Sequence, residues 1–154
     1  MNKNILIFGL LFSFLTFGSC NFAPGSYPYS ETYTLKIKKT DLIDIIHKFK
    51  EDNPNYAVPD SVQLQDGRMG DHDYWYHVYF YYKSDNTILH TWVRQSDSES
   101  TIFALVAESE GLNLGNWRFI NKDFSNKENQ QQKVKFEQQI LNIIRAKLKQ
   151  NSKI

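Results

Sequence analysis

The distribution of hydrophobic and polar residues divides the chain into two parts. Residues 5–17 are almost uninterruptedly apolar, whereas residues 33–150 alternate short apolar segments with polar turns. The first segment is shorter than the roughly 20 residues that a membrane-spanning helix needs. It also lacks the polar face of a helix that packs on a protein core. The first part therefore predicts a cleaved targeting segment, and the second predicts a folded domain.

Six segments of the second part have the alternation or the β-branched and aromatic content of strands. They are residues 33–37, 62–64, 74–83, 87–95, 101–108 and 117–120. The segment 101–108 is apolar on both faces, so we expect it near the middle of a sheet. The turn Ser84-Asp85-Asn86 joins the two preceding segments into a hairpin.

Two further segments have the periodicity of helices. In the first, apolar residues recur at i, i+3, i+4 and i+7: Leu42, Ile45, Ile46 and Phe49. Thr40-Asp41 is expected to cap this helix and Asn53-Pro54 to end it. The second helix covers residues 127–149, with the apolar stripe Phe136, Ile140, Ile144 and Leu148. The order of elements predicts an α+β fold: an antiparallel meander sheet of about four to five strands, with an N-terminal and a long C-terminal helix packed on one face.

The apolar run at the start of the chain has the flanks of a secretory signal peptide. Lys3 precedes it, and the motif Phe17-Gly18-Ser19-Cys20 follows it with two small residues and the chain's only cysteine. This order resembles the lipobox of bacterial lipoproteins, with Phe17 where that motif usually has Leu. The resemblance covers residues 1–20 alone. It implies cleavage before Cys20, lipidation of its thiol and anchoring in a membrane. Asn21, in place of an Asp, favours the outer membrane over the inner one.

The resemblance of residues 1–20, together with the pattern of the remaining residues, predicts four parts in the chain. They are a cleaved lipoprotein signal peptide (1–19), the lipidated Cys20 with a short flexible tether (20–32), a single α+β domain (33–150) and a disordered tail (151–154). Two prolines and a glycine keep the tether extended. Because the tether is short, we expect the domain to lie close to the lipid surface.

Composition narrows the classes of partner. Removal of residues 1–19 leaves 135 residues with 17 Lys+Arg against 17 Asp+Glu, so the mature chain is formally neutral. It lacks the broad basic footprint of a nucleic-acid-binding protein. A single cysteine excludes an intramolecular disulfide. Aromatic residues make up 15% of the chain, which supplies enough buried area for a core.

The hairpin of residues 74–95 separates two sets of side chains. A turn of two or four residues is expected to place Tyr79 opposite Trp92. One face then forms a candidate binding surface of Trp75, His77, Tyr79, Tyr81, His90, Trp92 and Arg94. The other face is core and consists of Tyr76, Val78, Phe80, Leu89 and Val93.

Two interpretations of the candidate binding surface stay open. Aromatic rings with an arginine suit sugars, peptides and protein partners, because rings give contact area at a low entropic cost. Aromatic residues also pair across the strands of ordinary sheets, and a helix could cover this face.

Chemistry-bearing residues are few. Asp71, His72 and Asp73, together with His77 or His90, have the ligand types of a metal site but no repeated ligand spacing. No serine has the context of a nucleophile elbow. The sequence therefore predicts no catalytic set, no metal and no cofactor.

The sequence thus favours a lipid-anchored bacterial envelope protein, periplasmic or surface-facing. Its small non-enzymatic domain would contact a protein or peptide partner at the membrane surface, as an accessory subunit of an envelope machine does. One alternative is a periplasmic immunity-type lipoprotein that neutralises a toxin. Another is a small envelope hydrolase that uses the region of Asp71, His72 and His77.

Overall fold

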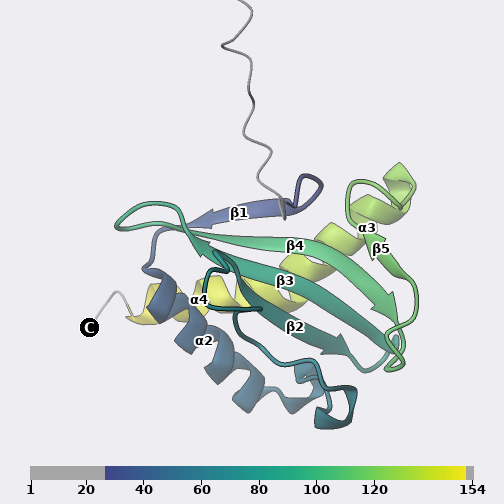
Figure 1. Cartoon of the computed structure of the whole chain (residues 1–154). Helices are drawn as coiled ribbons and strands as arrows, with labels where there is room; N and C mark the ends of the chain where they lie inside the picture. The colour runs from purple at the N-terminus through teal and green to yellow at the C-terminus, as the bar shows by residue number, and fades with distance from the viewer. Residues whose placement is uncertain (1–26, 152–154) are drawn as a thin grey trace, which may run out of the picture.

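The computed structural model describes residues 27–151, which form a five-stranded antiparallel sheet with helices on one side (Figure 1). The strands are β1 (Glu31–Leu35), β2 (Tyr76–Tyr82), β3 (Thr87–Gln95), β4 (Thr101–Glu110) and β5 (Trp117–Phe119). The helices are α2 (Lys39–Asp52), α3 (Asn126–Phe136) and α4 (Asn142–Asn151). The expected signal peptide, Cys20, the first part of the tether and the end of the tail lie outside the described residues.

Strand β4 is the centre of the sheet. The strand order is β1-β4-β3-β2, and β5 pairs with the second half of β4 on the side that β1 also occupies. Strands β2, β3 and β4 form the meander, while β1 comes from the start of the domain and β2 is the opposite edge (Figure 1). The central position expected for residues 101–108 is confirmed, and so is the α+β class.

The register of the β2–β3 hairpin differs from the expected one by two residues. Its turn has four residues, 83–86, and the pairing begins at Tyr82 opposite Thr87. Tyr79 therefore lies opposite His90, and not opposite Trp92 as expected. The expectation was wrong because each extra pair of turn residues moves the pairing by two. A shift of two keeps every side chain on its expected face.

The helices cover one face of the sheet, called here the inner face. In Figure 1, α3 and α4 run in line across this face and α2 lies beside them. The apolar stripe expected for α2 is buried, as are Phe136, Ile140 and Ile144 of the C-terminal helical region. These side chains pack against inward residues of the strands, among them Val78, Phe80, Leu89, Val93, Phe103 and Leu105.

Local structure departs from the sequence prediction at three places. Residues 62–64 are not a strand, because a short 3-10 turn, Asp60–Val62, ends at Gln63 with a left-handed φ of 60°. Helix α2 begins at Lys39, and the expected cap at Thr40-Asp41 is replaced by Gln95 of β3, whose Oε1 accepts the backbone N–H of Lys39 at 2.8 Å. A π-helical turn, Glu137–Leu141, separates α3 from α4. Ile140 and Leu141 of this turn are both fully buried.

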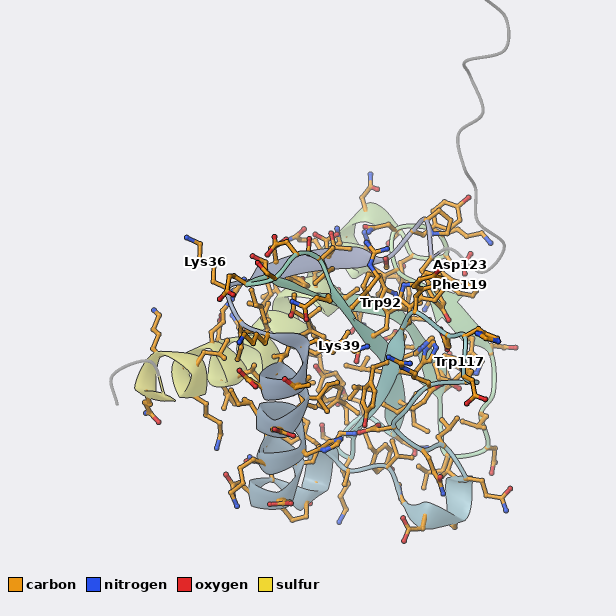
Figure 2. All side chains as sticks on the ribbon, turned by 60° about the vertical axis from the view of Figure 1, so that its left-hand side comes forward. Lys36, Lys39, Trp92, Trp117, Phe119 and Asp123 are labelled. Atoms are coloured by element: carbon orange, nitrogen blue, oxygen red, sulfur yellow. The ribbon has the colours of Figure 1, made fainter. Side chains whose placement is uncertain are left out.

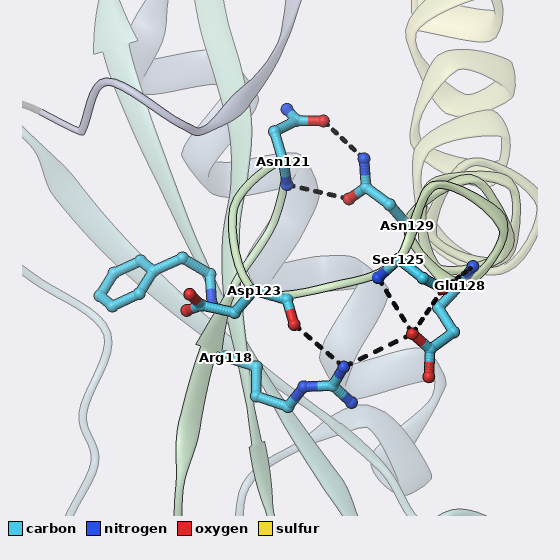
Figure 3. A network of polar contacts seen from close by, with 7 residues as sticks. Arg118, Asn121, Asp123, Ser125, Glu128 and Asn129 are labelled. Carbon is cyan, nitrogen blue, oxygen red and sulfur yellow. Dashed lines mark hydrogen bonds and ion pairs between the residues drawn. The ribbon is translucent and has the colours of Figure 1, made fainter.

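A polar network fixes the connection between β5 and α3 (Figure 3). It consists of Arg118, Asn121, Asp123, Ser125, Glu128 and Asn129. Ser125 and Glu128 form a capping box, in which each side chain accepts a hydrogen bond from the backbone N–H of the other. Arg118 pairs with Glu128 at 3.7 Å. Asn129 donates to Asn121 Oδ1 at 2.7 Å and accepts from the Asn121 N–H at 2.9 Å.

The capping box predicts the effect of one substitution. Ser125→Ala is expected to lower the free energy of unfolding by about 1 kcal/mol, because the first turn of α3 loses its cap. Ser98→Ala, at an exposed position in the β3–β4 turn, is the matched control and is expected to change stability by less than about 0.5 kcal/mol. Urea denaturation measures both. Equal values for the two variants would contradict the role of the cap.

Candidate functional site

The face of the sheet turned away from the helices, called here the outer face, carries a cluster of packed rings. This outer-face cluster consists of Tyr27, Trp75, His77, Tyr79, His90, Trp92 and Trp117. It contains all three tryptophans of the chain. Figure 2 shows Trp92 and Trp117 on the side of the molecule turned away from α4.

Five of the seven residues of the candidate binding surface come together in this cluster: Trp75, His77, Tyr79, His90 and Trp92. The other two lie at its ends. Tyr81 lies near the β2–β3 turn, where its hydroxyl donates to Asn86 Oδ1 at 2.9 Å. Arg94 is exposed at the other end, with its guanidinium carbon 5.9 Å from the centroid of the Trp92 ring.

The centre of the cluster is packed and closed. His77 is 2% exposed, and Tyr79 and Trp92 are each 5% exposed. Tyr27 packs over two of them, because its ring centroid lies 6.0 Å from that of His77 and 6.3 Å from that of Trp92. The cover is thus a residue of the expected tether, held by a turn in which the Ser30 hydroxyl donates to the Tyr27 carbonyl at 2.9 Å.

The segment before β2 is fixed along the free edge of that strand. Gly67 exchanges two backbone hydrogen bonds with His77, of 2.9 and 2.7 Å. Asp66 Oδ1 accepts the backbone N–H of Tyr79 at 2.9 Å, and Oδ2 of the same side chain pairs with Lys50 of α2. These contacts hold the loop that carries Asp73 and Trp75 against the outer face.

Three side chains of this region form a hydrogen-bonded relay. Asp73 Oδ2 lies 2.9 Å from Nε2 of His77, and Nδ1 of His77 lies 2.8 Å from Nε2 of His90. A carboxylate only accepts, so His77 donates through Nε2–H and accepts at Nδ1 from Nε2–H of His90. This arrangement needs no charge on either imidazole.

Electrostatics favour the same proton arrangement. Burial, and then the neighbouring His77, lower the pKa of His90 to about 3. Burial raises the pKa of Asp73, but hydrogen bonds from the backbone N–H groups of Trp75 and Met69 and from His77 outweigh it and hold this pKa below its usual range. Asp73 is therefore an ionised acceptor that orients the buried ring of His77 and, through it, the half-buried ring of His90.

The relay does not extend to the other residues considered for chemistry. Asp71 and His72 are exposed and line an open groove with Lys39, Arg68 and Arg94; Asp73 also borders this groove, whereas His77 and His90 do not. Within residues 27–151, no group of three His, Asp or Glu side chains is placed to hold a metal ion. Both ring nitrogens of His77 are already hydrogen-bonded inside the relay.

Exposed side chains form a rim around the closed centre. The aromatic rim consists of Tyr29, Tyr74 and Phe119, which are 46%, 76% and 36% exposed. Lys122 Nζ lies 5.5 Å from the ring centroid of Tyr29 and 5.4 Å from that of Phe119. A cleft of about 210 Å³ opens here, between the turn that begins at Tyr27 and the loop after β5. Figure 2 shows Phe119 on the same side as Trp92.

Sequence reasoning did not identify two members of this site, Tyr27 and Trp117, and considered a third, Asp73, only as a metal ligand beside His77 or His90. Tyr27 covers the cluster from a segment that carries no strand or helix pattern. Trp117 joins the cluster because β5 pairs with β4, opposite Ser109. Asp73 orients His77. In the sequence, only its position four residues before this histidine could have indicated that role.

Comparisons of the chain with models of protein families, with curated proteins and with solved structures find no match. In the part of the chain that the structure describes, no helix combines the length and the hydrophobicity needed to cross a bilayer.

The relay makes a prediction about titration. Because its pKa is lowered to about 3, the ring of His90 is expected to stay neutral from pH 8 down to about pH 5. In that range an unfolded chain binds a proton at this histidine and the folded one does not, so His90 lowers stability progressively as the pH falls below 6.5.

The measurement is an NMR titration of the histidine ring resonances of the folded protein. The same titration of the urea-unfolded chain is the control, in which the His90 ring is expected to titrate near the reference value of about 6.5. A midpoint near this value in the folded protein would contradict the closed, hydrogen-bonded relay.

Proposed function

We propose that this chain is a lipid-anchored protein of the bacterial envelope whose α+β domain is a non-enzymatic binding module for a protein or peptide partner at the membrane surface. The observation that carries the proposal is the order of the first twenty residues, from Lys3 through the apolar run to Cys20. Fatty acyl groups on Cys20 would hold the domain on the membrane, since each buried CH₂ contributes about 0.8 kcal/mol.

The start of the described chain fits such an anchor. Tyr27 follows Cys20 by seven residues and packs on the outer face. Seven residues span at most about 25 Å when fully extended. A domain held in this way stays within a short distance of the bilayer, where it can meet partners that are themselves bound to the envelope.

An open groove on the helical side supports the binding role. It lies between α2 and α4 and has a volume of about 1070 Å³. Its apolar residues are Ile37, Ile45 and Leu148, and charged residues of both signs surround them, among them Asp41, Asp44, Lys48 and Arg145. An apolar centre with a charged rim is the usual anatomy of a protein interface. The outer-face cluster, in contrast, is closed by its own side chains.

The anchor makes the first prediction. Cys20→Ser is expected to abolish incorporation of labelled palmitate and to move the protein from the membrane fraction to the soluble fraction, because no other cysteine can replace it. Ser19→Ala keeps a small residue before the cysteine and is expected to behave like the unaltered chain. Unchanged membrane association of the Cys20→Ser chain would contradict the lipid anchor.

The groove makes the second prediction. A photo-crosslinking amino acid at Asp41 is expected to give a protease-sensitive adduct of discrete mass in intact cells. The same residue at Asp60, which is exposed outside the groove, is expected to give none. Immunoblotting of the irradiated cells measures both. Equal adducts at the two positions would show that the groove has no preferred partner.

A further inference from the structure

We propose that the outer face of the domain lies against the lipid bilayer, with its aromatic rim and neighbouring cations at the level of the phospholipid headgroups. The aromatic rim is Tyr29, Tyr74 and Phe119, and the cations are Arg68, Arg94 and Lys122. The inference rests on the proposed lipidation of Cys20. It adds which face of the domain the membrane contacts.

The first argument is the place where the chain enters the fold. Tyr27 lies on the outer face and not at the edge of the domain. Its ring centroid is 5.3 Å from that of Trp75 and 6.3 Å from that of Trp92. The lipidated cysteine would lie at the membrane interface, at most about 25 Å away along the chain. The outer face is therefore the face that the anchor brings nearest to the headgroups.

The second argument is the kind of side chain that the rim exposes. Aromatic side chains with a polar tip are enriched at membrane–water interfaces, where the ring lies in an apolar layer and the tip stays hydrated. Tyr74 is 76% exposed and Tyr29 is 46% exposed, although the rings beside them are packed. Trp75 and Trp117 are partly exposed on the same face. The closed centre keeps this surface rigid.

The third argument is charge. Within residues 27–151, no ion pair joins a carboxylate to Arg68, Arg94 or Lys122. Of the acidic groups on this side, Asp73 is occupied by the relay and Asp123 accepts the backbone N–H of Phe119 at 2.8 Å. Asp71 and Asp123 are the exposed carboxylates among these, against the three exposed cations Arg68, Arg94 and Lys122. A cationic side chain close to an anionic lipid surface contributes about 1 kcal/mol.

A bilayer fits this face better than a protein partner does. The cations and aromatic rings are spread around the closed centre, and the largest hollow among them, between Arg68 and Arg94, is open and polar. A planar, fluid, anionic surface can contact cations and rings that are spread out in this way, whereas the anchor residues of a protein interface bind in central pockets. The groove between α2 and α4 remains on the other side of the sheet for a partner.

The three tryptophans allow a direct test, because all of them belong to the outer-face cluster. The acylated full-length mature protein is reconstituted into vesicles of phosphatidylcholine and phosphatidylglycerol, with or without a nitroxide on the lipid headgroups. Tryptophan emission is expected to be about two-fold lower in the labelled vesicles, because the rings lie at headgroup level.

Two double variants test the contribution of the rim. Arg94→Glu with Lys122→Glu reverses two exposed cations of the outer face and is expected to relieve most of the quenching. Lys36→Glu with Lys83→Glu makes the same change in net charge at exposed positions outside the rim and is expected to leave the quenching unaltered. Figure 2 shows Lys36 far from Trp92 and Phe119.

The outcomes separate the two proposals. A protein that carries no palmitate and does not float with vesicles refutes the lipid anchor. A protein that floats with vesicles but is equally fluorescent with both lipids refutes the contact of the outer face, while the anchor stands. Equal quenching in the two double variants also refutes the contact of the outer face, because the tether alone would then explain why the tryptophans lie near the headgroups. A change of emission with an envelope protein but not with lipid would make the rim a protein-binding surface.

Discussion

The burial of β4 on both of its faces is the constraint on which the rest of this structure depends. Phe103 and Leu105 point to the inner face, and Ala104 and Val106 to the outer one, and none of the four is more than 1% exposed. An antiparallel sheet with helices on one side usually leaves its other face to water. Here the outer face needs a cover of its own, and aromatic side chains of β2, β3 and β5, together with Tyr27, provide it.

That requirement explains the buried His77 and the half-buried His90. Rings of their size fill the outer layer, but a buried imidazole costs stability unless its nitrogens are hydrogen-bonded. Asp73 supplies the terminal acceptor for His77, and His77 supplies the acceptor for His90. The relay therefore satisfies polar atoms within an aromatic layer, and its geometry follows from packing without any need for a reaction. The exposed surfaces on which the two proposals rest are the aromatic rim and the groove between α2 and α4.

The sequence predicted the structure well where a property repeats along the chain. It did not where the arrangement depends on a single turn or on one contact between distant residues. Periodicity identified the buried stripe of α2 and assigned Val78 and Phe80 to the core, because each pattern averages over several residues. The length of the hairpin turn depends on a few dihedral angles, so the partner of Tyr79 was placed two residues away. Tyr27 was missed because its contacts are with strands far along the chain, and no local pattern encodes them.

The two proposals describe one arrangement of the domain between a membrane and a partner. The sheet separates the outer face, where the chain enters at Tyr27, from the groove between α2 and α4. If the outer face lies on lipid, the groove points away from the bilayer, since the helices cover the opposite side of the same sheet (Figure 1). A short tether then helps to maintain this orientation, because it limits rotation of the domain and keeps the groove accessible. A long tether would lose this orientation, and contacts of the rim alone would have to supply it.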